Sequence, residues 1–406
     1  MKIVKKYNET SLVLRIVIGL VIGIALALLV PKASWISLFG TVFVGALKAI
    51  APILVFVLVS SALAQSNQKL GSQFVTIIVL YLCSTFLAAV VAVIGSTLFP
   101  VTLQQLAAAA DNAAPEGLGS VFKDLLCNIV SNPVASMANA NYLGILFWAV
   151  VLGIALRKAS ESTKTMLRNF SDAVSTAVRW VINLAPFGIM GLVFDAVSSS
   201  GLAIFTDYGK LLLLLVGCMA VSALVVNPVM AFVCIRKNPY PLVLRCLKES
   251  GVTAFFTRSS AANIPVNMAL CEDLGLNKEL YSVSIPLGST VNMAGAAVTI
   301  TVMTLAAAHT QGIQVYIPVA ILLSVMAALG ACGASGVAGG SLLLIPMACS
   351  LFGISNDIAM QVVGVGFIIG VIQDSVETAV NSSSDVLFTA VAEFRQRRKE
   401  GREINF

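Results

Sequence analysis

The sequence predicts an all-α polytopic membrane protein, and three observations support that prediction. First, 58% of the 406 residues are hydrophobic and only 11% are charged, whereas a soluble domain carries about 25% charged residues. Second, the apolar residues gather in long blocks, several of them near or above the roughly 18 residues that cross the hydrocarbon core as a helix. Third, the apolar blocks are continuous. A continuous block indicates a helix rather than a barrel strand, because a helix satisfies its own backbone hydrogen bonds in lipid.

The first 240 residues are regularly organised and predict six transmembrane helices. Their apolar blocks include residues 12–30, 41–64, 74–99, 142–156 and 211–235. The first block has about 19 residues and no clean cleavage site after it, which indicates a retained helix rather than a signal peptide. One long segment, residues 101–140, predicts a loop with partial helices because it contains Pro115, Asn132 and Pro133.

Basic residues cluster in segments that alternate with segments poor in positive charge. The basic clusters lie at the N-terminus, at Lys69, and around residues 157–168, 236–248 and 395–402. The positive-inside rule places these clusters in the cytoplasm, so both termini are expected there and the number of crossings is even. The basic tail at 395–406 is expected to be a solvated end beside the membrane rather than a nucleic-acid site.

The cysteines and the single histidine argue against a catalytic or metal centre. The eight cysteines lie mostly in or beside apolar blocks and form no CxxC pair, which indicates buried small side chains. A membrane enzyme such as an intramembrane protease is disfavoured because the Ser259–Ser260 pair has no histidine base nearby, and His309 is far along the chain. The sequence therefore predicts a protein that is not an enzyme.

Two apolar segments in the second half are broken at their centres. Residues 241–274 contain Arg258 flanked by hydroxyl residues and followed by Pro265, and a charge at the bilayer centre costs about 2.5–3.5 kcal/mol. Residues 318–352 contain five glycines between Gly330 and Gly340, which disfavour a stable helix. We predict two re-entrant helical hairpins in corresponding positions of inverted repeats, the arrangement that marks a transporter site. The alternative is a pair of glycine-rich packing helices.

The last apolar segment carries acidic and amide side chains on one face. Asp374, Glu377, Asn381 and Asp385 follow one another at spacings i, i+3, i+7 and i+11. On a helix they fall within an arc of about 80°, with Thr378 at its edge. Three unpaired carboxylates there would cost roughly 8–10 kcal/mol, so the stripe must face protein, cations or substrate. The alternative is that this end of the helix is exposed to water, which would explain Asp385 but not Asp374.

The donors and acceptors of this region fit an amino acid and a cation. A carboxylate at Asp374 can accept from an ammonium group, and Asn381 with a hydroxyl such as Ser260 can donate to a carboxylate. Asp385, Asn292 and nearby carbonyls offer oxygen ligands for a hard cation.

These segments resemble the sodium-coupled dicarboxylate/amino acid symporter family, which includes glutamate transporters, over nearly the whole chain. The most specific similarities are Thr257-Arg258-Ser259-Ser260, Pro286-Leu287-Gly288, Asn292-Met293, the second hairpin, and Asp374 to Asp385, with Lys48, Pro52 and Ala185-Pro186-Phe187-Gly188 in addition. Within the family the chain most resembles the bacterial serine/threonine:sodium symporters. The resemblance implies eight transmembrane helices plus two re-entrant hairpins, a homotrimer in the bacterial inner (cytoplasmic) membrane, and an elevator-type transporter.

The resemblance also implies a division into domains. Residues 1–240 would be mainly scaffold and trimerisation helices, with the third and sixth helices joining the transport domain. The transport core, residues 241–394, would comprise hairpin 1 (about 242–278), helix 7 (281–308), hairpin 2 (318–352) and helix 8 (357–394), before the cytoplasmic basic tail at 395–406.

Site residues follow from the same resemblance. The implied substrate contacts are Ser260 and Asn381 for the carboxylate, Asp374 with Thr378 for the ammonium, and the backbone around Arg258 and Val337 for closure. One sodium ion would be bound by Asp385, Asn381, Asn292 and the carbonyl of Gly288. A second would be held by carbonyls near Thr290, Met293, Ala331, Cys332 and Ala334. Sodium is expected as a transported ion, not a prosthetic group.

The chain departs from the acidic-substrate pattern of the family. Ala294 replaces an acidic residue, which puts a third sodium in doubt, and Ala296 replaces a threonine that contacts the substrate side chain. Glu377 stands where glutamate transporters place an arginine, and an arginine would form a bidentate pair with a substrate carboxylate. Glu377 is therefore expected to repel acidic substrates and either to accept a hydrogen bond from the hydroxyl of a serine or threonine substrate or to pair with Arg258.

These expectations converge on a sodium-coupled importer of L-serine and L-threonine, with membrane lipid as a further partner and no nucleic acid. The alternatives are a symporter for other small neutral amino acids or for dicarboxylates, coupling to protons, and an ion channel. A channel is disfavoured because the region offers both acid and amide partners for a zwitterion.

Overall fold

The computed structural model describes residues 12–65, 72–103, 130–139, 141–202, 204–332 and 339–404. Across these ranges the secondary structure is helical and no strand occurs, which confirms the predicted all-α class. The elements of the first half are α2 (Leu12–Leu29), η1 (Ser34–Ile36), α3 (Ser37–Ala64), α4 (Ser72–Leu98), α6 (Pro133–Ala138), α7 (Tyr142–Leu156), α8 (Glu161–Asn183), α9 (Ala185–Ser200), α10 (Ile204–Val221), η2 (Ser222–Val226) and α11 (Asn227–Ile235).

The second half contains shorter and more interrupted elements. They are α12 (Tyr240–Cys246), η3 (Leu247–Gly251), α13 (Val252–Thr257), α14 (Ser260–Asp273), α15 (Lys278–Val291), α16 (Ala294–Thr310), α17 (Ile317–Ala331), η4 (Gly340–Leu344), α18 (Ile345–Ser350) and α19 (Asn356–Lys399). Both η2 and η3 are π-helical turns inside longer helical runs, a local widening that is often found at functional sites.

Several helical runs are suited to crossing a membrane. Among the described residues, five are long and apolar enough: 34–61, 73–98, 205–235, 278–310 and 356–399. A sixth is obtained if α8 and α9, which are bent by 52° relative to each other, form one broken span. α2, α7 and α17 are apolar but shorter. The chain is therefore a multi-pass membrane protein.

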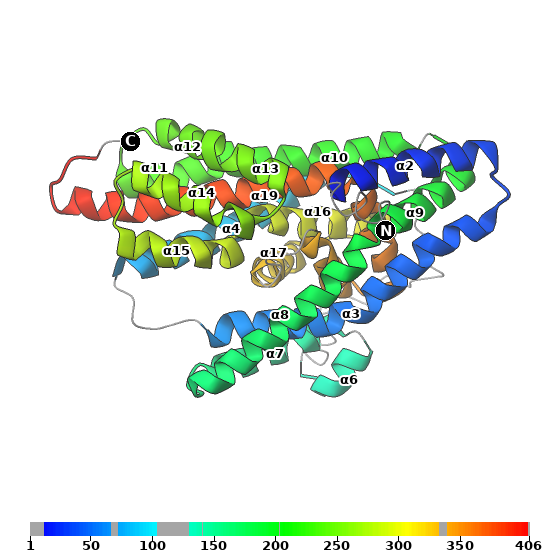
Figure 1. The fold of residues 1–406 in the computed structure, drawn as a ribbon, viewed down its shortest axis with the longest axis horizontal. Helices are drawn as coiled ribbons and strands as arrows, with labels where there is room; N and C mark the ends of the chain where they lie inside the picture. Colours follow the sequence, from blue (N-terminus) through cyan, green and yellow to red (C-terminus); the bar gives the residue numbers. More distant parts are fainter. Residues whose placement is uncertain are drawn as a thin grey trace, which may run out of the picture.

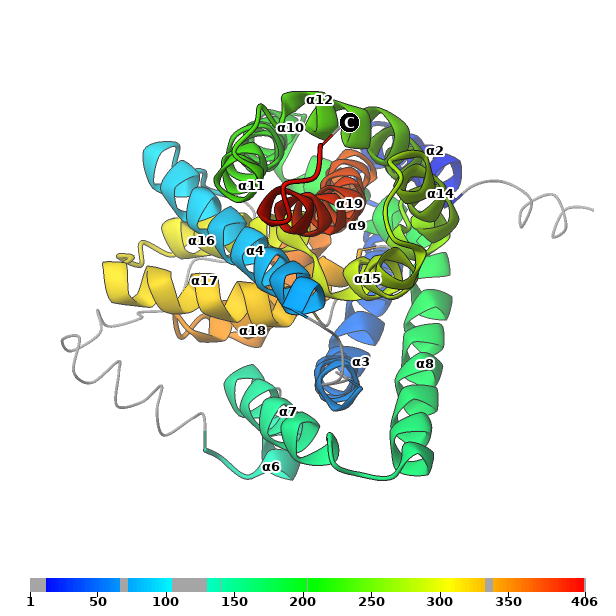
Figure 2. The ribbon, with the colours of Figure 1, turned by 90° about the vertical axis from the view of Figure 1, so that its left-hand side faces the viewer.

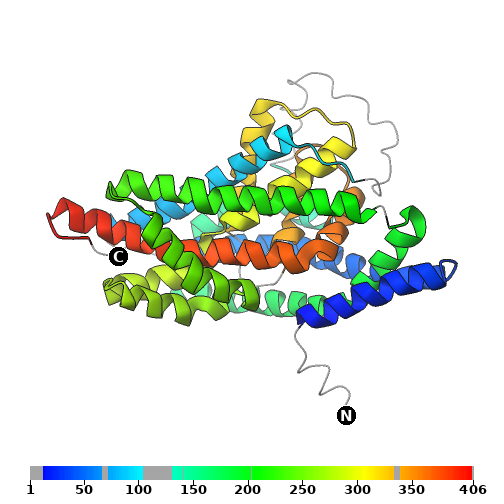
Figure 3. The ribbon, with the colours of Figure 1, turned by 90° about the horizontal axis from the view of Figure 1, so that it is seen from above.

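Helix α19 forms the centre of the fold. It lies along the long axis of the molecule (Figure 1), and the view along that axis shows α4, α11, α12, α14 and α15 around it (Figure 2). From above, α19 runs between α10 and the pair α14 and α15 (Figure 3). Most side chains of α19 between Ala359 and Phe394 are buried, so its polar stripe faces protein and not lipid.

A second group of helices packs beside this centre. α2 lies along α9, and α3 packs against α7, α8 and α9 (Figures 1 and 2). α4, α10 and α11 instead pack on the elements of the second half, chiefly α16, α17 and α19. The apolar blocks 74–99 and 211–235 thus pack against the C-terminal half.

The first predicted hairpin is formed by two helical arms. Helices α12 to α13 run to Thr257, and α14 returns after a tip at Arg258, which adopts a left-handed conformation with φ 52°. Asn263 and Asn267 of α14 bond Ser250 of the first arm, at 3.0 Å and 2.5 Å between side-chain atoms. Both asparagines also donate to the Ser382 hydroxyl of α19. This buried network joins the two arms to the central helix.

The second predicted hairpin has α17 as its first arm and η4 with α18 as its second. The arms are in contact at Gly330, where an added Cβ would lie 2.5 Å from Cε at the end of the Met347 side chain. The tip residues 333–338, which include the predicted contacts Ala334 and Val337, lie outside the described residues.

Two expected elements differ in detail. The predicted helix 7 is two helices, α15 and α16, which meet at a break formed by Asn292 and Met293. The predicted helix 8 runs through Lys399, beyond the expected end at residue 394. Two contacts of Glu393 stabilise that extension: its carboxylate accepts from the Asn277 N–H at 2.7 Å and pairs with Arg397. Together they hold the first turns of the basic tail against the base of hairpin 1.

Candidate functional site

Four parts of the fold converge on the polar stripe of α19. They are the tip of hairpin 1, the α15–α16 break, the start of η4 in hairpin 2, and α19 itself. Asp374, Glu377, Asn381 and Asp385 are all buried on α19. The stripe predicted from their spacing is thus an interior surface lined by three other elements.

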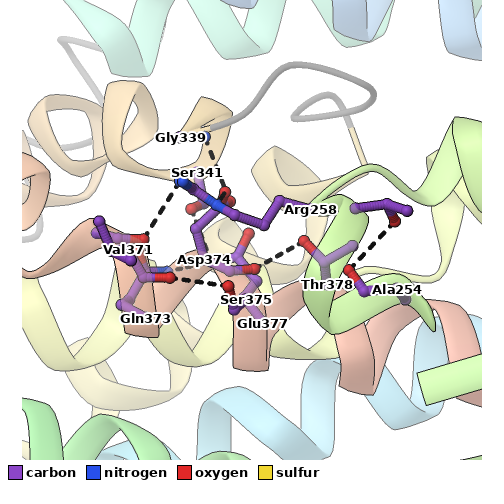
Figure 4. Close-up of polar contacts among 12 residues, drawn as sticks. Ala254, Arg258, Gly339, Ser341, Val371, Gln373, Asp374, Ser375, Glu377 and Thr378 are labelled. Atoms are coloured by element: carbon purple, nitrogen blue, oxygen red, sulfur yellow. Dashed lines mark hydrogen bonds and ion pairs between the residues drawn. The ribbon is translucent and has the colours of Figure 1, made fainter. Parts of the chain in front are cut away.

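Arg258 and Asp374 form the first contact of the site. The Arg258 Nε donates to Asp374 Oδ2 at 2.7 Å, and its Nη2 donates to the Gly370 carbonyl at 3.3 Å. The Gly339 N–H of hairpin 2 donates to the other carboxylate oxygen of Asp374 at 3.3 Å. Figure 4 shows Arg258 extending over Asp374 from the hairpin 1 side. The Asp374 charge is therefore compensated by groups from both hairpins.

Glu377 is held by neutral donors. Its Oε2 atom accepts from Thr299 at 2.7 Å, from Ser341 at 2.8 Å and from Gln373 at 2.5 Å. The sequence left open whether Glu377 accepts from a substrate hydroxyl or pairs with Arg258. Among the described contacts Arg258 pairs with Asp374, and Glu377 accepts from hydroxyl and amide groups of the protein. Hydrogen bonds to an ionised acceptor are stronger than neutral ones, so a hydroxyl is a favourable ligand for this carboxylate.

The start of α16 packs directly on α19 at this level. An added Cβ at Gly295 would lie 2.8 Å from the Glu377 carbonyl oxygen and 2.9 Å from its Cα. The Gly295 N–H donates to Asn381 Oδ1 at 2.7 Å, and Asn381 Nδ2 approaches the Met293 sulfur at 3.4 Å. Because Gly295 has no side chain, α19 can approach closely enough for Glu377 and Asn381 to contact the helix break.

Asp385 and Asn292 form a second polar cluster, nearer the C-terminal end of α19. Asn292 Nδ2 donates to Asp385 Oδ1 at 2.9 Å and to Ser384 Oγ at 2.7 Å. The Asp385 Oδ2 and Asn292 Oδ1 atoms are buried, and neither has a hydrogen-bond partner among the described residues. An added Cβ at Gly288 would lie 2.6 Å from Asp385 Oδ1. One unsatisfied carboxylate oxygen and one unsatisfied amide oxygen are the kinds of ligand that a hard cation prefers.

The other predicted contacts are placed as follows. Ser260 is buried at the first position of α14, and the Thr378 hydroxyl donates to the Asp374 carbonyl at 2.7 Å. Thr290 donates to the Leu287 carbonyl at 2.9 Å. Of the residues predicted for a second cation, the Cys332 thiol donates to the Val291 carbonyl at 3.3 Å, and Ala331 and Met293 belong to one buried hydrophobic cluster.

Several residues of the site were not anticipated from the sequence. They are Thr299, Ser341, Gln373 and the backbone groups of Gly339 and Gly370. Gln373 and Gly370 had a local signal, because each lies on α19 one helical turn before an acidic residue of the stripe. Thr299, Ser341 and Gly339 come from other parts of the chain, and only the tertiary fold brings them to the stripe.

Comparison with known proteins places the chain among membrane transporters. A family model described as the sodium:dicarboxylate symporter family matches residues 12–394. A protein named serine/threonine transporter SstT from Bifidobacterium adolescentis is 64% identical over 399 residues, which cover 98% of this chain and 93% of that protein. Proteins of the same name from Streptococcus agalactiae and Streptococcus thermophilus are 63% and 61% identical, over 97% and 98% of this chain and 98% and 99% of their own. The predicted family resemblance is confirmed.

Proposed function

The chain belongs to the sodium:dicarboxylate symporter family, and from that premise we propose that it imports L-serine and L-threonine together with sodium. Family membership makes it a transporter and not an enzyme. The name shared by its similar relatives supports the hydroxy amino acids as substrates. The rest of the proposal depends on the geometry of the α19 stripe.

The observation that carries the proposal is the environment of Glu377. A fixed carboxylate surrounded by hydroxyl and amide donors attracts a further hydroxyl and repels a second substrate carboxylate. Asp374 binds the substrate ammonium in the proposed complex, and Ser260 with Asn381 donates to its carboxylate. The backbone around Arg258 and Val337 closes over the bound molecule, with Thr378 beside it. A neutral amino acid with a side-chain hydroxyl satisfies all of these groups.

Sodium is the coupling ion in this proposal. Asp385, Asn292, Asn381 and the Gly288 carbonyl provide the first ion's ligands, and the unsatisfied Asp385 Oδ2 and Asn292 Oδ1 atoms support this assignment. We assign a second ion to carbonyls near Thr290, Met293, Ala331, Cys332 and Ala334. One inward charge at 100 mV yields about 2.3 kcal/mol. A tenfold sodium gradient raises the total to about 3.7 kcal/mol, or several hundred-fold accumulation of a neutral zwitterion.

The proposed assembly follows the family pattern. It comprises eight transmembrane helices and two re-entrant hairpins, a homotrimer in the bacterial inner membrane, and both termini in the cytoplasm. The packing of α4, α10 and α11 on the C-terminal half supports a transport domain that combines these helices with residues 241–394. The group of α2, α3, α7, α8 and α9 then serves as the scaffold against which this domain moves as an elevator.

The decisive experiment is uptake of radiolabelled serine into proteoliposomes with and without a sodium gradient. We expect sodium-dependent uptake that unlabelled threonine inhibits strongly and aspartate inhibits weakly. Stronger inhibition by alanine than by threonine would identify a different neutral substrate. Uptake driven by a pH gradient without sodium would refute sodium coupling.

The variant Glu377→Arg tests whether Glu377 selects the substrate, because it places a guanidinium where the carboxylate stands. We expect this variant to lose preference for serine and to accept aspartate as a competitor. An unchanged preference for serine over aspartate would show that Glu377 does not select the substrate.

A further inference from the structure

An apolar groove lies between α4 and α10, away from the polar stripe. It encloses about 870 Å³, within the range of roughly 300–1,000 Å³ that is typical of small-molecule sites. One wall is formed by residues 91–101 at the end of α4, and the other by residues 210–221 of α10. Apart from Lys210 and Cys218, the lining side chains are aliphatic or aromatic, or are absent at glycine.

The two walls run antiparallel, so the groove has two chemically different ends. Cys218 lies near the inner end of the α4 wall, because its thiol is 3.9 Å from the Val91 carbonyl. Lys210 lines the other end, where α4 terminates at Leu98 and α10 has just begun. The Lys210 side chain is 64% exposed and 3.3 Å from Asp207. One end therefore carries an exposed lysine that is paired with Asp207, and the remainder is apolar.

The length of the groove matches one leaflet of a bilayer. Eleven residues separate Lys210 from Val221 on α10, which corresponds to about 16 Å along a helix. Half of a hydrocarbon core of about 30 Å is about 15 Å. A groove of this length spans one leaflet when Lys210 lies at the depth of the headgroups.

We propose that this groove binds one membrane phospholipid, with an acyl chain between α4 and α10 and its phosphate at Lys210. An acyl chain has no hydrogen-bonding groups, and the groove walls present almost none. A non-helical peptide segment at the same depth would leave its backbone N–H and C=O groups without partners. Lysine at the open end complements the phosphate charge, an attraction that acts near the membrane surface.

A pair of glycines on α10 provides a matched test. Gly217 lines the groove, and a Cβ added there meets no atom within 4 Å. Gly209 lies on the same helix, is also free of neighbours within 4 Å, and does not line the groove. Gly217→Leu fills the groove, whereas Gly209→Leu makes the same change in helix propensity without filling it.

The experiment is native mass spectrometry of the detergent-purified full chain after addition of dioleoylphosphatidylglycerol. We expect one lipid retained per wild-type chain, retention lowered at least tenfold in Gly217→Leu, and unchanged retention in Gly209→Leu. Lys210→Gln should lower the affinity about fivefold, the contribution of one lysine near a lipid surface. The exposed Lys32→Gln variant serves as its control.

Three results would overturn the proposal. Equal retention by the two glycine variants would show that the lipid does not bind in the groove. Absence of retained lipid from the wild type would mean that the groove does not bind phospholipid. If Gly217→Leu does not fold, the Lys210→Gln comparison decides, and equal affinity to wild type contradicts the proposal. None of these readouts depends on the transported substrate.

Discussion

Arg258 and Asp374 are 116 residues apart in the chain, yet their side chains form a 2.7 Å ion pair that is almost completely shielded from solvent. This pair joins the tip of hairpin 1 to the central helix. It also places a guanidinium against the carboxylate proposed to bind the substrate ammonium. Arg258 and a bound amino acid must therefore compete for Asp374 or share its two oxygens.

Replacing Arg258 with alanine should make the protein depend on its substrate for stability. Removing one partner of a buried ion pair costs about 3–5 kcal/mol, because the remaining charge is uncompensated. A bound serine returns a positive charge to Asp374. Serine with sodium should therefore raise the melting temperature of Arg258→Ala more than that of the wild type, as measured by intrinsic fluorescence.

The control for this experiment is Arg402→Ala, since Arg402 pairs with the exposed Glu400 near the C-terminus. Its serine-induced shift should equal that of the wild type. An equal shift in Arg258→Ala as well would mean that the ammonium does not reach Asp374.

Glu377→Gln should weaken serine transport selectively. The substitution removes the charge and presents an amide group to the donors of Thr299, Ser341 and Gln373. Loss of a hydrogen bond to a charged group costs about 1.5–3 kcal/mol, so kcat/KM for serine should fall roughly 10- to 100-fold. Alanine has no hydroxyl, and its uptake should fall less. A parallel decrease for both amino acids would indicate a purely structural role.

Asp385→Asn should raise the sodium requirement. The substitution keeps the side-chain shape but removes the negative charge from the cluster with Asn292, and hard cations depend on carboxylate oxygens. We expect the sodium concentration for half-maximal serine uptake to increase at least tenfold. Asp195→Asn, at an exposed position of α9, should leave it unchanged. If both variants behave alike, the ion binds elsewhere.

Gly295→Ala should destabilise the site by steric conflict. The added Cβ meets backbone atoms of Glu377 at 2.8 and 2.9 Å, and backbone cannot rotate away as a side chain does. Overpacking of this kind costs about 1–3 kcal/mol. Thermal unfolding should show a lower melting temperature than for Gly209→Ala, where the added methyl group meets no neighbour. Equal melting temperatures would contradict the close packing of α16 on α19.

The sequence predicted those features that depend on local pattern. Helical spacing was sufficient to place Asp374, Glu377, Asn381 and Asp385 on one face, because a helix has a fixed period. The polar centre of residues 241–274 was sufficient to predict a break, because lipid does not tolerate it. Both inferences need only the chain's own periodicity and the cost of burying polar groups.

The partners of each charged group could not be predicted in the same way. Arg258 had two carboxylates within plausible reach, and only the relative position of hairpin 1 and α19 decides between Asp374 and Glu377. The donors Thr299 and Ser341 belong to elements whose approach is set by packing at glycine positions such as Gly295.

The continuity of α19 has a mechanical consequence. One uninterrupted helix of 44 residues, about 66 Å long, connects the stripe at Asp374 to the basic residues near Lys399. A helix without an internal break transmits displacement along its axis instead of absorbing it. In the proposed elevator movement, a fluorophore attached beyond Lys399 should therefore change its distance from the proposed scaffold each time the site crosses the membrane.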